Sequence, residues 1–152
     1  MDLGKKMLLR RFLWYQFPAV VWMIVIFIQS SIPYLSTPDL GFKLQDKLAH
    51  IVEFGIFGLL LFRAFFFSKS SLLKKWSYQF TIGMGVIYAI FDEIHQSWVP
   101  GRAADKYDVI ADIVGLIFVT VIFECWHRKK KKQGKMVFEK NGKKVTDGAG
   151  IQ

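Results

Sequence analysis

Long apolar stretches along this chain alternate with short polar connections. The stretches cover approximately residues 12–32, 51–67, 76–91 and 107–126. The first, from Phe12 to Ile32, contains no ionisable residue, and as a helix its 21 residues would extend about 31 Å, enough to cross a bilayer core. We favour an uncleaved span over a signal peptide, because the apolar run is long and Gln29–Pro33 does not resemble a small-residue cleavage site.

Three further helical spans are predicted, at about residues 46–67, 76–98 and 106–126. No segment shows the sustained two-residue alternation that is typical of strands, so the pattern predicts an all-α fold with four transmembrane helices. Ala111 and Gly115 form a small-xxx-small pair that lets two helix backbones approach closely in lipid. The predicted organisation is a basic N-terminal arm (1–11), a transmembrane domain (12–126) and a basic, flexible tail (127–152).

The distribution of charge predicts the orientation of these spans. The chain is 53% hydrophobic yet carries a net charge of +9. Seventeen of its 21 Lys and Arg residues lie in the N-terminal arm, the 63–75 connection and the tail, whereas Lys43, Lys47, Arg102 and Lys106 lie on the other side together with eight of the 12 acidic residues. The positive-inside rule then places both termini in the cytoplasm and the protein in the cell membrane.

Composition also excludes several classes of protein. A soluble nucleic-acid binder would interleave basic residues with its core-forming segments, which this chain does not do, so we expect membrane lipids and no nucleic acid as partners. Its single cysteine excludes an intramolecular disulfide framework. The Lys-rich run 129–132 follows directly after a span, which is typical of a topology anchor that also contacts anionic headgroups.

Three of the predicted spans carry ionisable side chains near their outer ends. Helical spacing places one set on a shared face of each span: Asp46, His50 and Glu53; Asp92, His95 and Gln96; Asp105, Asp108 and Asp112. The carboxylates of Glu53, Asp92 and Asp112 each lie about 9–10 Å inside the outer end of their span. Facing lipid at that depth would cost several kcal/mol, so we predict a shared polar pocket that opens to the outside.

Three roles for this pocket remain open. It is a structural network in which Lys47, Arg102, Lys106 and the histidines neutralise carboxylates, a metal site, or a site for ligand binding or acid–base chemistry. The metal interpretation rests on His50, Glu53, Asp92 and His95, but no known metal signature is complete, and we expect no cofactor. The candidates for acid–base groups are His50, Glu53, Asp92 and Glu93. The candidate ligand-binding residues are Asp46, His50, Glu53, Asp92, Glu93, Gln96, Arg102, Asp108 and Asp112.

Three blocks in this region resemble the VanZ-like family of bacterial membrane proteins. They are Asp46-Lys47-Leu48-Ala49-His50-Ile51-Val52-Glu53-Phe54, then Asp92-Glu93-Ile94-His95-Gln96 with Pro100-Gly101-Arg102, then Asp108-Val109-Ile110-Ala111-Asp112-Ile113-Val114-Gly115. Ser30-Ser31 and Pro33 at the end of the first span also fit, and the resemblance covers about residues 12–126. Two positions depart from the pattern: Phe54 stands where the family usually has Tyr, and Asp112 stands where Asn is common.

The resemblance implies a role in the cell envelope. The family takes its name from a protein associated with resistance to the lipoglycopeptide teicoplanin. We therefore expect the outward pocket to bind the headgroup of an envelope lipid, a lipid-linked precursor or a lipoglycopeptide, and to contribute to resistance or to envelope homeostasis. The alternative is a membrane-embedded enzyme that acts on a lipid-linked substrate through its histidine and carboxylates. A proton-coupled carrier is disfavoured, because the inner halves of the spans offer almost no polar pathway.

Overall fold

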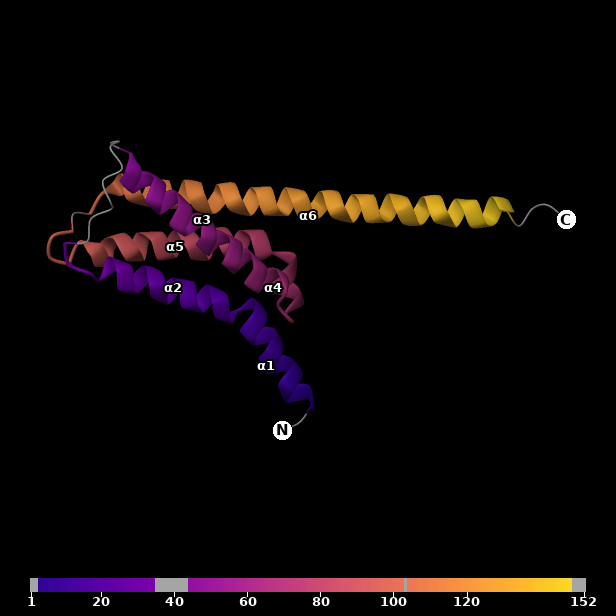
Figure 1. Ribbon diagram of the computed structural model, residues 1–152, viewed down its shortest axis with the longest axis horizontal. Coiled ribbons are helices and arrows are strands. Elements are labelled where there is room, and N and C mark those ends of the chain that lie inside the picture. The colour runs from indigo at the N-terminus through magenta and orange to yellow at the C-terminus, as the bar shows by residue number, and fades with distance from the viewer. Residues whose placement is uncertain (1–2, 35–43, 103, 149–152) are drawn as a thin grey trace. The chain divides into compact units, whose positions relative to one another are not determined.

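Every regular element in the described part of the chain is a helix. The computed structural model describes residues 3–34, 44–102 and 104–148, with side chains beyond Lys130 only at 132, 133 and 136. The predicted all-α class is therefore confirmed, whereas Asp39 and Lys43, which entered the charge count, lie outside the described residues. The helices, labelled in Figure 1, are α1 (Leu3–Tyr15), α2 (Phe17–Ser30), α3 (Gln45–Phe66), α4 (Ser71–Lys75), α5 (Ser77–Gln96) and α6 (Lys106–Gly148).

The first predicted span is bent rather than straight. α1 and α2 meet at Gln16 with an angle of 42° between them. Pro18 is the second residue of α2, and proline lacks an amide hydrogen while its ring collides with the carbonyl four residues earlier, which here belongs to Trp14. The apolar pattern located this span, but the bend follows from the proline alone. Together α1 and α2 are long and apolar enough to form one broken span.

Two other helices reach spanning length and apolarity by themselves. They are α3 and the Lys106–Lys130 part of α6, so the described residues contain two such helices, or three if the bent pair counts as one. α5 occupies the third predicted span but is not among them. It begins at Ser77 with polar neighbours and ends in a turn that contains Asp92, Glu93 and Gln96, so both of its ends are polar.

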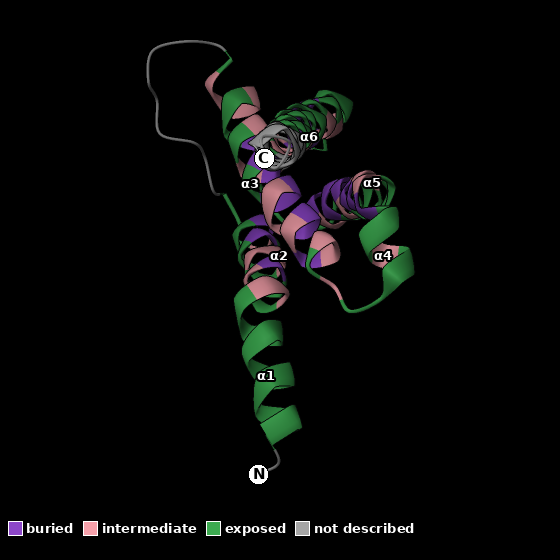
Figure 2. Cartoon of the chain, turned by 90° about the vertical axis from the view of Figure 1, so that its right-hand side faces the viewer, coloured by how far each residue is buried: buried purple, intermediate pink, exposed green. Residues whose placement is uncertain are grey.

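The core of the first compact unit, residues 1–120, forms around α3. This helix packs against both α2 and α5, and its Phe54 and Phe57 rings are fully buried in edge-to-face contact, with ring centroids 5.9 Å apart. Tyr88 of α5 donates a hydrogen bond of 2.6 Å to the Met23 carbonyl of α2. Figure 2 shows that α1, by contrast, is exposed along almost its whole length.

Large apolar side chains also cover the outside of this unit. Ile87 of α5 is 70% exposed, and Ile24 of α2 and Val52 of α3 are exposed as well. Soluble monomers rarely expose so many large apolar side chains. A helical unit that is apolar both inside and outside is typical of a protein surrounded by lipid.

Gly115 lets α6 approach α3 closely. A Cβ atom at this position would lie 2.1 Å from the Ile51 carbonyl oxygen, so the two backbones are in direct contact. Ala111, one helical turn earlier, is buried as well. The small-xxx-small pair predicted from the sequence thus lies where two helices meet.

The second compact unit, residues 121–152, continues α6 as far as Gly148, and residues 149–152 lie outside the described part. The prediction of a flexible tail from residue 127 concerns motion and stays a prediction. Lys is the commonest residue of this stretch and has high helix propensity. Arg128 also pairs with Glu124 one turn earlier at 2.5 Å, which adds local support. Lack of hydrophobic periodicity did not prevent helix formation here.

The contact at Gly115 predicts the effect of a single added methyl group. We expect Gly115→Ala to lower the thermal unfolding temperature in detergent, because the obstacle is the backbone of Ile51, which has no rotamer to change. The cost should be of the order of 1–3 kcal/mol, as for other overpacked sites. Gly83→Ala on α5 is the matched control, since a Cβ there meets nothing within 4 Å. Equal stability of the two variants would contradict this packing.

Candidate functional site

A lysine and two aspartates join the beginning of α3 to the beginning of α6. Asp105 precedes α6 and accepts a hydrogen bond of 2.9 Å from the Tyr107 amide, as an N-cap residue does. The Lys47 ammonium lies 2.6 Å from the other Asp105 oxygen and also donates to Asp108. The hydrogen bonds that Lys47 and the Tyr107 amide donate to Asp105 hold the pKa of this carboxyl below its ordinary value. The start of α6 is therefore tied to α3 by charge.

His50 lies between two aspartates of α6. Its Nδ1 is 2.9 Å from Asp112 Oδ1, and its Nε2 is 3.9 Å from Asp108 Oδ2. Both His50 and Asp112 are buried, Asp112 almost completely. Because Asp108 also contacts Lys47, these side chains form one continuous network from the surface to the interior.

Asp92 of α5 has one partner on α2 and one on its own helix. The Ser30 hydroxyl donates to Asp92 Oδ1 at 2.6 Å, and Gln96 Nε2 donates to Oδ2 at 2.8 Å. All three side chains are buried. Neighbouring His95 is less buried, and its Nε2 lies 2.9 Å from the Ser31 hydroxyl while its ring stacks on Phe27. The end of α2 and the end of α5 are thereby joined by polar groups.

Glu93 is buried with one of its oxygens unmatched. Its Oε1 accepts a hydrogen bond from the Asp105 amide, which fastens the connection before α6 to the end of α5. Its Oε2 has no hydrogen-bond partner among the described residues, and the Nε of Arg102 is likewise buried without one. A buried polar atom without a hydrogen bond costs about 1–3 kcal/mol of stability. We therefore expect each of these two unpaired atoms to have a role that compensates this cost.

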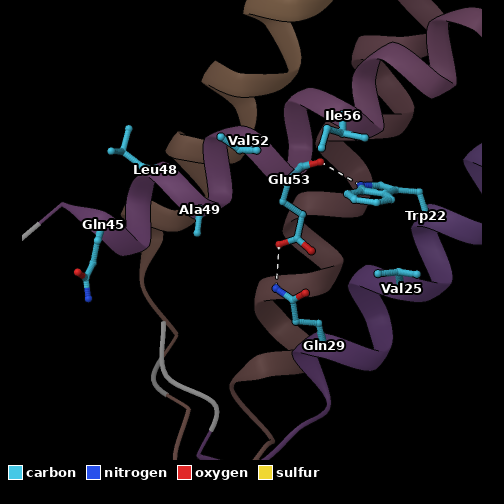
Figure 3. A pocket seen from close by; sticks show the side chains of 9 residues that line it. All are labelled: Trp22, Val25, Gln29, Gln45, Leu48, Ala49, Val52, Glu53 and Ile56. Atoms are coloured by element: carbon cyan, nitrogen blue, oxygen red, sulfur yellow. Dashed lines mark hydrogen bonds between the residues drawn. The ribbon is translucent and has the colours of Figure 1, made fainter. Parts of the chain in front are cut away.

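Glu53 lies in a groove between α2 and α3. The groove has a volume of about 450 Å³ and is lined by Trp22, Val25, Gln29, Gln45, Leu48, Ala49, Val52, Glu53 and Ile56. Figure 3 shows the Glu53 carboxylate directed toward the Gln29 amide, whose Nε2 lies 3.4 Å from Oε2. The Trp22 indole donates to the Glu53 backbone carbonyl at 3.1 Å. Carboxylate and amide thus form a small polar patch in a mainly apolar groove.

Arg102 is held over the end of α2 by the connection between α5 and α6. Gly101 has φ +77°, and a Cβ there would lie 2.1 Å from the Tyr34 ring, so this turn requires glycine. The Tyr34 amide donates to the Pro100 carbonyl at 3.2 Å. Arg102 Nη2 then donates to the Gln29 carbonyl at 2.8 Å. A cation at the negative end of a helix is electrostatically favourable, and Arg102 makes no ion pair within the described ranges.

Glu53, Asp92 and Asp112, the three carboxylates predicted to share a pocket, have different hydrogen-bond partners. Only Glu53 of the predicted ligand-binding set lines the groove of Figure 3. Asp92 and Asp112 are instead engaged in the two buried networks.

One comparison identifies the family. The family model VanZ/LLP1 matches residues 15–127 of the chain. The chain belongs to the VanZ/LLP1 family. The resemblance drawn from the three sequence blocks is therefore confirmed, and every candidate site residue lies within the matched range. Neither a curated protein nor a solved structure matches the chain.

The VanZ/LLP1 region does not bring together the four residues considered as metal ligands. His50 contacts Asp112, Asp92 contacts Ser30, and the remaining two, Glu53 and His95, contact Gln29 and Ser31. A different set, Asp46, His50 and Asp108, has ligand atoms within 4.8 Å of one another among the described residues. The Lys47 ammonium contacts Asp108 and lies 3.9 Å from Asp46, so its positive charge already compensates the negative charge of these two carboxylates.

Sequence reasoning assigned no role in the site to the end of α2. Gln29, Ser30 and Ser31 interact with Glu53, Asp92 and His95 respectively. The signal that locates them is their position, because they are three consecutive polar residues at the end of an otherwise apolar span in this VanZ/LLP1 domain. Asp105 was placed on a shared helical face but not among the ligand-binding residues, although its carboxylate is a partner of Lys47.

Proposed function

We propose that this VanZ/LLP1-family chain is a four-span protein of the cell membrane whose outward polar residues bind the headgroup of an envelope lipid or lipoglycopeptide. Such binding would lower the access of teicoplanin-type antibiotics to the envelope. The observation that carries the proposal is the position of Glu53, which belongs to the cluster of interacting carboxylates and also lines an apolar groove. Amphiphiles require this combination of a polar contact and an apolar wall.

The proposed topology has both termini in the cytoplasm and α5 as a full span. The distribution of Lys and Arg supports it, because the arm, the 63–75 connection and the tail hold most of them. α5 is less apolar than the other spans, but Asp92 and Gln96 at its outer end are buried against α2 rather than directed at lipid. Its polar end is therefore compatible with a span.

The geometry favours binding over acid–base chemistry. In an Asp–His pair such as Asp112–His50, the free Nε2 would act on the substrate. Here Nε2 faces Asp108 at 3.9 Å, and the imidazole is buried. Asp108 is in turn ion-paired with Lys47. These contacts suit a fixed network better than a group that must reach a substrate.

The topology predicts which engineered cysteines a membrane-impermeant maleimide will reach in intact cells. In a Cys125→Ser background, Trp98→Cys should be labelled, because this exposed residue lies in the outer connection between α5 and α6. Lys69→Cys, between α3 and α4, should be labelled only after permeabilisation. The opposite pattern would invert the proposed orientation, and labelling of both in intact cells would contradict the four-span count.

Susceptibility to teicoplanin tests the proposed binding. In a susceptible host, expression of the wild-type chain should raise the inhibitory concentration of teicoplanin, and Glu53→Gln and Arg102→Ala should remove most of the increase at equal expression. Lys74→Ala is the matched control, since it removes an exposed cation of the 63–75 connection that does not line the groove. Indistinguishable susceptibility of wild type, variants and empty vector would refute the proposed role in resistance.

A further inference from the structure

The wall of the groove between α2 and α3 is suited to a hydrocarbon chain. Six of its nine lining residues are apolar: Trp22, Val25, Leu48, Ala49, Val52 and Ile56. Val52 is 60% exposed, so the wall is accessible from outside the unit. In a membrane the molecules at this surface are lipids, and an acyl chain matches such a wall without leaving polar groups unpaired.

Two opposite charges lie around Gln29. Its side-chain amide donates to the Glu53 carboxylate, and its backbone carbonyl accepts a hydrogen bond from the Arg102 guanidinium. Within the described residues Glu53 and Arg102 form no ion pair with each other, although their charges interact. Gln29 therefore contacts both an anion and a cation, each able to attract the opposite charge on a bound molecule.

We propose that this groove binds a zwitterionic phospholipid with a primary ammonium headgroup. The ammonium contacts Glu53, the phosphate lies toward Arg102, and one acyl chain follows the apolar wall of α3. The inference rests on the function proposed above and names the substrate class for the same site. Charge complementarity selects this occupant, because Glu53 repels a purely anionic headgroup and Arg102 repels a purely cationic one.

The ammonium must be primary because the polar patch needs hydrogen-bond donors. The Glu53 carboxylate is an acceptor only, and the 3.4 Å contact with Gln29 leaves it weakly satisfied. A primary ammonium offers three N–H donors, whereas a quaternary ammonium offers none. The groove should therefore distinguish phosphatidylethanolamine from phosphatidylcholine, which share the same net charge.

Lipid retention by the purified full-length chain tests the inference. The protein is reconstituted in nanodiscs with equal amounts of phosphatidylethanolamine, phosphatidylcholine and phosphatidylglycerol, and the lipids that remain bound after gentle extraction are counted by native mass spectrometry. We expect phosphatidylethanolamine to be enriched roughly ten-fold over each of the others, the size of one charge-assisted hydrogen bond. Wild-type protein alone gives this result, so it does not depend on the folding of a variant.

Variants then assign the preference to the two charges. Glu53→Gln should abolish the enrichment of phosphatidylethanolamine over phosphatidylglycerol, while Arg102→Gln should lower retention of all three lipids. Arg63→Gln, on the same helix as Glu53 but ten residues away, is the matched control and should leave retention unchanged. Ala49→Phe, which fills the groove, should reduce retention of every lipid.

Equal retention of the three lipids by the wild type would overturn the inference, as would a preference that Glu53→Gln leaves intact. Either result would leave the broader proposal standing if teicoplanin susceptibility still depends on Glu53 and Arg102. Conversely, a phosphatidylethanolamine preference without any effect on susceptibility would support the groove and refute the role in resistance.

Discussion

Ionisable groups are costly to place inside a membrane span, and this cost determines which partners the buried polar side chains of this protein require. A carboxylate that faces hydrocarbon costs several kcal/mol, whereas the same group inside a hydrogen-bonded network does not. Asp92 meets this constraint with Ser30 and Gln96, and Asp112 meets it with His50. The Asp92–Ser30 and Asp112–His50 contacts join helices that are distant in sequence, so satisfying these charges also fixes the helices relative to one another.

The same constraint separates the residues of the polar cluster that are fully engaged from the two that the proposal assigns to binding. Asp92, Asp108 and Asp112 are buried and engaged. Glu53 and Arg102 are less buried, and both contact Gln29 rather than a charged partner. Two opposite charges that are not paired with each other can each attract a charged group of a ligand. The proposed binding site therefore lies at these two residues.

Much of the outer polar layer could be predicted from helical spacing. Asp46, His50 and Glu53 share a face of α3, and the depth of Asp92 and Asp112 predicted that these carboxylates would face one another or a water-filled cavity rather than lipid. Spacing within one helix does not specify which helix lies opposite, so the pairing of Asp92 with Ser30 and of His50 with Asp112 required the structure. The bend before Pro18 and the helix beyond residue 127 were missed for another reason. Local backbone chemistry determines both, whereas hydrophobic periodicity reports only burial.

A double-mutant cycle on His50 and Asp112 tests most directly whether buried charge pairing holds these helices together. The free energy of unfolding in mixed detergent micelles is measured for the wild type, His50→Leu, Asp112→Leu and the double variant. Each single variant leaves a polar partner buried alone, so the double variant should be less destabilised than the sum of the two, with a coupling free energy of about 1–3 kcal/mol. Effects that add to within about 0.5 kcal/mol would contradict the account.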